Sequence, residues 1–367
     1  MSSAPQHSAE PAQGRTVSPS KPAAARARTA RRLWRSTRHL WPVTGLLVLI
    51  VVVFSASTPH FFTRTNLVIL LTSNTALWVV AIGMTAVMIS GAVDLSTGAF
   101  VAFLSILFAK LLEAHVPSVL ALLVTIAAGA AIGGAVNGLL IGRLRLSFLL
   151  VTLASLTALT GFVNLWSETK SIPVFSSLTD RIAFGDTLGI NTSVLIMVVV
   201  FLVALFVQTR TYFGRDIYAV GGNPVAASLA GISGARTTVA VFAISGAAAA
   251  LAAVVSVGRS SAASPTVDNS LPLQAIACVL LGGASISGGS GGVGGTVLGV
   301  LFLGTLGNGL SLSGISSYWQ AVVTGVILVG AVLLNRISDG GLSVPFKRPF
   351  NRRRGSTAGV ASPGAQP

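Results

Sequence analysis

Asp94 is the residue whose surroundings are best suited to chemistry. It lies in the segment Gly91-Ala92-Val93-Asp94-Leu95-Ser96-Thr97-Gly98 and is the one carboxylate flanked by apolar sequence on both sides. An acid inside a membrane is costly, so it marks a candidate functional site. Three roles are open: a helix cap that accepts the amide hydrogens of Ser96 and Thr97, a substrate or gating contact, and a proton relay.

The stretch from Thr211 to Ile232 is the second informative segment. Asn223 is typical of an N-cap, Pro224 of a first helical residue and Gly231 of a helix end. The helix between them is too short, and its side chains are too small, for it to be a core element. It suits insertion into a groove of a partner protein. A plain amphipathic linker is the alternative. The side chains of this short helix include Ala226, Ala227 and Leu229.

No catalytic motif accompanies these segments. None of the lysines follows a glycine as a Walker A loop requires, and the four histidines are scattered along the chain. Cys278 stands alone in an apolar run, so neither an internal disulfide nor a metal cluster is expected. The chain is therefore predicted not to be an enzyme and to hold no cofactor. If ATP drives its activity, a separate ATPase must bind the ATP and Mg.

The composition excludes most soluble classes of protein. Only 9% of the 367 residues are charged, 52% are hydrophobic and the mean hydropathy is +0.82. Soluble domains carry about 25% charged residues. A globular cytoplasmic enzyme, a secreted disulfide scaffold and a disordered protein are therefore excluded, and most of the chain is expected in lipid. The net charge of +15 comes largely from two tails rather than from a nucleic-acid-binding surface.

The elements that must position these residues are transmembrane helices. A bilayer core of about 30 Å needs roughly 17–25 apolar residues per helix, and backbone amides in hydrocarbon must be satisfied internally. The predicted fold class is all-α, a polytopic membrane protein with about ten transmembrane helices. The predicted spans are 41–57, 67–89, 97–113, 118–142, 147–166, 193–208, 237–257, 272–287, 293–312 and 317–335.

Basic residues predict the orientation. An even number of spans places both tails on one side, and Arg143, Arg145, Arg210, Arg215 and Arg236 then lie in links on that same side. By the positive-inside rule this side is the cytoplasm. We expect disordered basic cytoplasmic tails at 1–38 and 338–367 around a transmembrane domain at 39–337. A signal peptide cleaved near Ser55-Ala56-Ser57 is disfavoured by the long preceding tail.

An internal repeat is also visible. Gly133-x3-Asn137-Gly138-Leu139 recurs as Gly304-x3-Asn308-Gly309-Leu310, 171 residues later, and the same offset carries spans 2–5 onto spans 7–10. Five spans separate the copies, so the second copy is inverted. Inverted repeats are typical of transporters, with the path at the repeat interface. Chance matching in a sequence rich in Gly and Ala is the alternative.

Several of these segments resemble the ribose/xylose-type permeases of bacterial sugar ABC importers. The matches come in order and cover about residues 65–335. They are the Gly91–Ser96 segment, Asn137-Gly138, Phe148 to Leu153, the segment from Gly214 to Ile232, Ala275-Ile276-Ala277 and the glycines from Gly282 to Gly289. The resemblance assigns the ATPase-coupling loop to Gly214, Arg215, Tyr218, Gly221, Gly222, Asn223, Ala226, Ala227 and Gly231.

The resemblance implies a dimeric, all-helical membrane subunit. It would receive sugar from an extracytoplasmic binding protein, and two cytoplasmic ABC ATPase subunits would drive it. The second permease copy makes a homo- or heterodimer in the bacterial plasma (inner) membrane. The chain departs from the family at Pro272, where an acidic residue usually precedes the Leu-x-Ala-Ile-Ala run, and this puts the usual pentose substrates in doubt.

We therefore expect a permease subunit for a small neutral solute, most simply a monosaccharide such as ribose or xylose. A sugar path should be polar and uncharged, with weak, multiple contacts. A proton-coupled secondary transporter that uses Asp94 is the alternative, and a passive channel or membrane scaffold is a third reading. The candidate path residues are Asp94, Ser96, Thr97, Asn137, Thr152 and Asn308.

Overall fold

The computed structural model describes residues 41–187 and 189–338 of the 367-residue chain, and in these residues it is almost entirely helical. The all-α prediction is therefore confirmed. The predicted tails at 1–38 and 338–367 lie outside the described residues, apart from Ser338 at the end of the last helix.

The helices follow one another with short links. Their bounds are α2 Trp41–Ser57, α3 Arg64–Ser73, α4 Thr75–Ile89, α5 Thr97–Glu113, α6 Ser118–Ile132, the π-helix η2 Gly133–Gly138, α7 Leu139–Gly142, α8 Phe148–Ser167, α9 Ser177–Phe184, α10 Thr192–Arg210, α11 Tyr212–Gly222, α12 Pro224–Leu229, α13 Gly234–Ser260, α14 Ser270–Leu281, α15 Val293–Leu312 and α16 Ser317–Ser338. Two small antiparallel pairs join β1 Ile172–Pro173 to β4 Ala262–Ala263, and β2 Asp186–Thr187 to β3 Ile190–Asn191.

Length and apolar composition identify five helices of the described chain that can cross a membrane, or six if the bent pair α3 and α4 counts as one span. Three shorter apolar helices, α2, α14 and the apolar part of α16, lie beside them. The count of ten spans thus stays a prediction. One boundary was wrong: the helix expected over 272–287 ends at Leu281, because the following residues include glycines with positive φ, which helices exclude.

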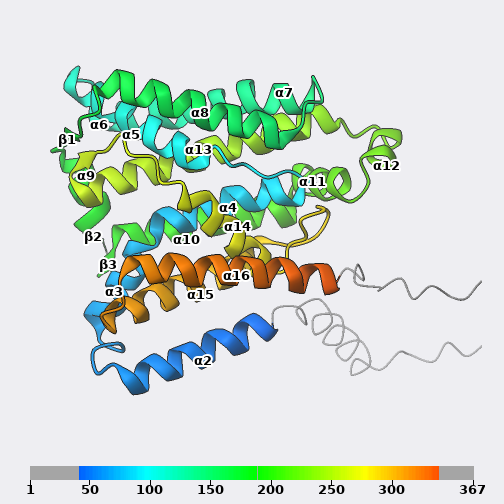
Figure 1. The fold of residues 1–367 in the computed structure, drawn as a ribbon. Coiled ribbons are helices and arrows are strands. Elements are labelled where there is room, and N and C mark those ends of the chain that lie inside the picture. The colour runs from blue at the N-terminus through cyan, green and yellow to red at the C-terminus, as the bar shows by residue number, and fades with distance from the viewer. Residues whose placement is uncertain (1–40, 188, 339–367) are drawn as a thin grey trace, which may run out of the picture.

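Two spans are broken in a related way. A non-helical stretch, residues 90–96, precedes α5, and a second one, residues 261–269, precedes α14. Figure 1 shows that these stretches enter the bundle from opposite ends. They meet inside it, where a Cβ atom on Gly98 would overlap the carbonyl oxygen of Asp268. Since the breaks are separated by nearly the repeat offset, the arrangement supports an inverted repeat.

The core is built around α4 and α13, which pack extensively against each other. Small residues let these helices approach closely, as is common between membrane helices. A Cβ on Gly83 of α4 would lie 2.8 Å from the Ala248 Cβ of α13, and a Cβ on Gly133 would overlap the Phe242 carbonyl oxygen. The π-helical turn η2 thereby lies directly on α13.

The two ends of the bundle differ. In Figure 1, α11 and α12 protrude at the end where α2 begins and α16 finishes, while α9 and the two strand pairs lie at the other end. The described chain therefore enters and leaves the bundle at the same end as the link Thr211–Ile232, as the charge pattern predicted. We call this the α12 end and the opposite one the β1 end.

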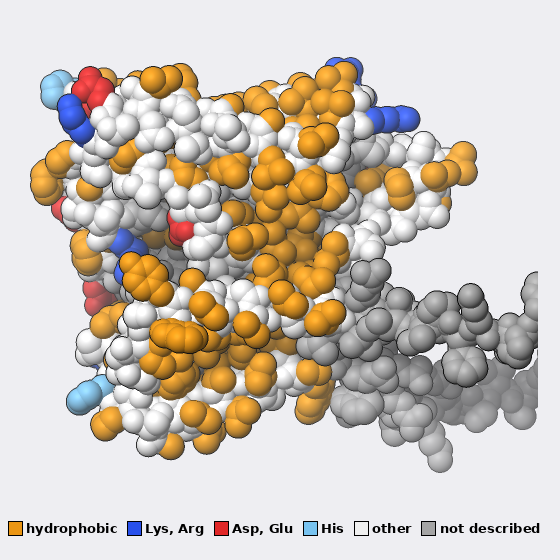
Figure 2. Space-filling view, viewed as in Figure 1, with side chains coloured by type: hydrophobic (Ala, Val, Ile, Leu, Met, Phe, Trp, Pro, Cys, Tyr) orange, Lys and Arg blue, Asp and Glu red, His pale blue; other side chains and the backbone are white. Residues whose placement is uncertain are grey.

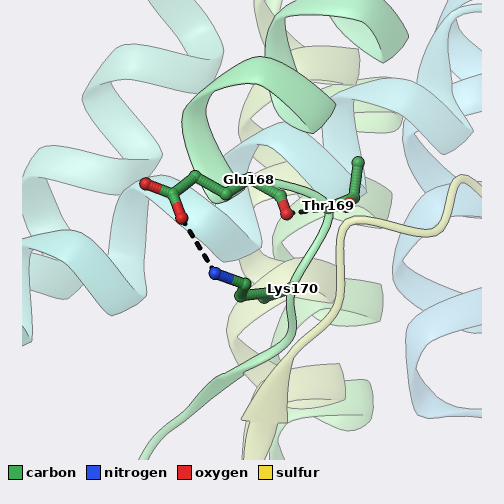
Figure 3. A network of polar contacts seen from close by, with 3 residues as sticks. All are labelled: Glu168, Thr169 and Lys170. Atoms are coloured by element: carbon green, nitrogen blue, oxygen red, sulfur yellow. Dashed lines mark hydrogen bonds and ion pairs between the residues drawn. The ribbon is translucent and has the colours of Figure 1, made fainter.

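The surface matches a membrane protein. Figure 2 shows hydrophobic side chains spread over the middle of the visible face, with the Lys, Arg, Asp and Glu side chains mostly near its two ends. A small polar network follows α8 at the β1 end (Figure 3): Lys170 pairs with Glu168 at 3.0 Å, and the Thr169 hydroxyl donates to the Glu168 carbonyl. This ion pair is exposed, so it adds little stability and shapes a solvated turn.

Candidate functional site

The caps predicted for the Thr211–Ile232 link are present. Asn223 Oδ1 accepts hydrogen bonds from the amides of Val225 at 3.1 Å and Ala226 at 2.9 Å, and Pro224 is the first residue of α12. Gly231 follows the helix with φ +82°, a conformation that favours glycine. Val225 and Leu229 are 70% and 86% exposed. The α12 end of the bundle therefore presents a short projection with an exposed apolar surface, which we call the knob (Pro224–Leu229).

A second helix, α11, precedes this knob, and the sequence reasoning had not identified it. The Thr211 hydroxyl caps it by accepting the Gly214 amide hydrogen at 3.1 Å. Gly214 is required because a Cβ there would overlap the carbonyl oxygens of Val207 and Gln208. On its exposed side the Arg215 guanidinium lies 4.3 Å from the centre of the Tyr212 ring. The apolar spacing Phe213, Ile217, Val220 was the signal for this helix.

The end of α11 touches two non-helical segments: the first break, residues 90–96, and the glycine-rich link between α14 and α15, residues 282–292. A Cβ on Gly221 would overlap the Ile89 carbonyl oxygen, and a Cβ on Gly288 would lie 2.8 Å from Gly91 Cα. The Gly289 amide donates to the Ile89 carbonyl at 2.8 Å. We call these contacts the glycine junction (Gly91, Gly221, Gly288 and Gly289). Because these contacts join backbone atoms, a shift of α11 would also displace the first break and the α14–α15 link.

Tyr218 connects α11 to the α14–α15 link by hydrogen bonds. Its hydroxyl donates to the Gly291 carbonyl at 2.6 Å and accepts from the Gln208 side-chain amide. Gln208 in turn accepts the Val293 amide hydrogen at 3.0 Å. Burial raises the pKa of Tyr218 above its usual value, although the Gln208 hydrogen bond opposes the shift, so the phenol stays a donor at neutral pH. Gln208 was missed, because nothing near it in sequence marks it.

Asp94 is buried at the centre of a polar network. Its carboxylate accepts the Ser96 amide hydrogen at 3.0 Å, the Ser96 hydroxyl, and the Ser245 hydroxyl at 2.8 Å. Asn137 donates to the Ser96 hydroxyl at 2.9 Å and accepts from the Ser155 hydroxyl. The Asp94 network (Asp94, Ser96, Asn137, Ser155 and Ser245) thus joins α5, η2, α8 and α13.

The cap proposed for Asp94 is present only in part. The carboxylate holds the Ser96 amide, but for Thr97 the contact runs the other way: the Thr97 hydroxyl donates to the Asp94 carbonyl at 3.0 Å. Thr152 is buried and bonds the Phe148 carbonyl of its own helix at 2.8 Å. Asn308 lies apart from the network and forms a reciprocal amide pair with Asn66, at 2.9 and 3.0 Å.

The pockets between the described helices include an apolar and a polar cavity. The apolar cavity, about 340 Å³, is bounded by α4, α10, α11 and α13, and its lining is almost entirely hydrophobic. The polar cavity, about 660 Å³, lies beside the 45° bend between α3 and α4 and is completed by α14, α15 and α16. Of the six candidate path residues, Asn308 lines the polar cavity, and none of the other five lines either cavity.

Comparison with known proteins identifies the chain's relatives. The family described as branched-chain amino acid transport system / permease component matches residues 66–332. The ribose import permease RbsC of Escherichia coli K12 is 38% identical over 79% of this chain and 91% of its own length. RbsC of Bacillus subtilis is also 38% identical, over 82% of this chain and 93% of its length. The L-arabinose ABC transporter permease AraH of Azospirillum brasilense is 33% identical over 88% of this chain and 95% of its own length.

No solved structure significantly matches the chain. The match to the family nevertheless spans the bundle from α3 to α16, including the link with α11 and α12, both broken spans and the Asp94 network. The apolar helices and these relatives together identify a multi-pass protein of the inner membrane. The chain therefore belongs to the family of ribose/xylose-type permeases of sugar ABC transporters and is a transport subunit rather than an enzyme.

Proposed function

We propose that this chain forms the translocation path of an ATP-driven importer for a monosaccharide such as ribose or xylose. Relatives named for ribose, L-arabinose and D-allose support the substrate class. The polar cavity is lined by amide and hydroxyl side chains together with apolar ones, and no charged side chain of the described residues lines it, which suits a neutral solute. ATP and Mg would be bound by the partner ATPase and not by this chain.

The observation that carries the proposal is the contact of α11 with the first break and with the α14–α15 link. In this proposal α12 inserts into an ATPase subunit through Val225 and Leu229, and Asn223 keeps the knob rigid. Movement of the knob passes along α11 through Gly221 and Tyr218 to the segments at Gly91 and Gly288–Gly291. The remaining members of the proposed coupling loop are Gly214, Arg215, Gly222, Ala226, Ala227 and Gly231.

The other partners follow from the same arrangement. An extracytoplasmic sugar-binding protein would dock at the β1 end, where the link between α8 and α10 carries α9 and the β2–β3 pair. Both termini would then be cytoplasmic, together with α12. A second permease copy would complete the membrane part of the complex.

The Asp94 network favours a structural and gating role over proton transfer. Each carboxylate oxygen of Asp94 accepts at least one hydrogen bond, and the described residues place no basic side chain against it. In this proposal Asp94, Ser96, Thr97, Asn137 and Thr152 hold one half of the path closed, and Asn308 borders the open half.

Reconstitution tests the energy source. Proteoliposomes would contain the chain, an ATPase subunit and a sugar-binding protein encoded beside it, and D-ribose uptake would be followed by radiolabel. Uptake should require ATP and should persist when an uncoupler collapses the proton gradient. Uptake that survives ATP depletion and stops with the uncoupler would refute the proposal and favour the proton-coupled alternative.

A second experiment tests the knob. Leu229→Glu places a charge on the exposed tip of α12 and should abolish co-purification of the ATPase. Phe175→Glu is the matched control, because Phe175 is 85% exposed near the β1 end. The control should retain the ATPase. Retention by the Leu229 variant would show that the knob is not the docking element.

A further inference from the structure

We propose that the polar cavity is the chamber that holds the solute, and that amide side chains recognise its hydroxyl groups. This inference rests on the proposed function and assigns the solute site within it. The chamber spans the two repeats, since its lining comes from α3 and α4 in the first copy and from α14, α15 and α16 in the second. Transport sites commonly lie at such an interface.

Three amides give the chamber its chemistry. Asn74 donates to the Leu70 carbonyl at 2.7 Å, Gln274 to the Ser270 hydroxyl at 3.0 Å, and Gln320 to the Ile315 carbonyl at 3.2 Å. Each amide is thereby oriented by one N–H group, while its carbonyl oxygen accepts no hydrogen bond from the described residues. An amide oxygen is a good acceptor for a hydroxyl donor, so the lining offers three oriented acceptors.

The other polar groups of the chamber are also uncharged. No Asp, Glu, Lys or Arg side chain of the described chain lines it, so an ionic solute would lose its hydration without gaining a counter-charge. At the rim, Arg259 donates to the Ser73 hydroxyl at 3.1 Å. The chemistry fits a neutral polyhydroxylated molecule. The further hydroxyl and amide residues are Ser73, Ser270, Asn308, Ser311, Ser317 and Thr324.

Glycines of α15 keep the chamber open. A Cβ on Gly304 would lie 2.9 Å from the Asn74 amide, so this glycine lets the amide occupy the bend between α3 and α4. A Cβ on Gly307 would meet nothing nearer than Gln320 Oε1 at 3.8 Å. A larger side chain at 307 therefore extends into the chamber and reduces its volume without disturbing the backbone.

The first test removes the acceptors. Gln274→Leu and Gln320→Leu should each lower ATP-dependent D-ribose uptake at least about tenfold, mainly by raising KM, because the replaced oxygen leaves a donor on the sugar unpaired. Asn164→Leu is the matched control: like Asn74, Asn164 bonds a carbonyl four residues earlier on its own helix, but it lies outside the chamber. D-xylose and L-arabinose would be measured in parallel.

The outcomes separate the two proposals. If the wild-type complex imports none of the three sugars with ATP, the proposed function fails. If it imports a sugar and both glutamine variants match the Asn164 control in KM, the solute chamber is refuted. Membrane insertion and co-purification of the ATPase establish that each variant has folded.

A second measurement does not depend on the glutamines. Ser311→Cys places a thiol in the chamber, and D-ribose should slow its modification by a small methanethiosulfonate reagent. The native Cys278 is fully buried and should not react. Gly307→Val should reduce uptake of the larger D-allose more than that of D-ribose. Absence of sugar protection together with an unchanged sugar preference would overturn the assignment.

Discussion

Asn137 and Asn308 occupy the same position of the repeated Gly-x3-Asn-Gly-Leu motif but make different contacts. Asn137 is fully buried and hydrogen-bonds to Ser96 and Ser155, whereas Asn308 pairs with Asn66 and borders the polar cavity. The first copy of the motif is therefore packed inside the bundle, whereas the second borders a cavity. Such asymmetry between inverted repeats is what an alternating-access transporter requires in any single conformation.

The Asp94 network should contribute strongly to stability. Ser245→Ala removes the hydroxyl that donates to Asp94 Oδ2, and a buried acceptor that loses its partner costs about 1–3 kcal/mol. Ser105→Ala is the control, since Ser105 is also buried but donates to the Val101 carbonyl of its own helix. Thermal unfolding in detergent should show the larger decrease in apparent Tm for the Ser245 variant. Equal decreases would contradict this prediction.

The glycine junction predicts a sharp difference between two adjacent glycines. Gly221→Ala forces a methyl group into the Ile89 carbonyl, whereas in Gly222→Ala the nearest atom is Gly289 Cα at 3.9 Å. Sugar-stimulated ATP hydrolysis of the assembled complex should be lost in the Gly221 variant and retained in the Gly222 variant. A Gly221 variant with normal stimulation would show that α11 does not transmit movement to the first break and the α14–α15 link.

Tyr218 offers a milder test of the same connection. Tyr218→Phe removes the hydroxyl shared with Gln208 and Gly291, and each neutral hydrogen bond contributes about 0.5–1.5 kcal/mol. We expect several-fold weaker sugar stimulation of ATP hydrolysis with unchanged ATPase binding. Tyr212→Phe keeps the ring beside Arg215 and should behave as wild type. Identical behaviour of the two variants would contradict the prediction.

Orientation can be read from cysteine labelling. The wild-type chain should not react with a membrane-impermeant maleimide, because Cys278 is buried. Leu229→Cys should react only from the cytoplasmic side, and Phe175→Cys only from the outside, since both positions are exposed near opposite ends. Labelling of position 229 from the exterior would reverse the predicted topology and refute cytoplasmic coupling.

Local features were read correctly from the sequence. Depletion of charge requires a lipid environment for most of the chain, and the Asn223-Pro224 cap satisfies the amides of its own first turn, so neither depends on distant contacts. The repeated Gly-x3-Asn-Gly-Leu motif was likewise visible, because it is a pattern of residue types. These properties were determined by short-range chemistry and composition, and they were sufficient to identify the family.

Only the tertiary structure decided which of the marked residues act together. It joined Asp94 to Ser245 and Asn137, and it placed Asn308 elsewhere, beside Asn66. It also brought Tyr218 to Gly291 across a gap of 73 residues. Such contacts arise from the packing of helices around α4 and α13, and that packing depends on close approach at small residues over the whole bundle rather than on any local pattern.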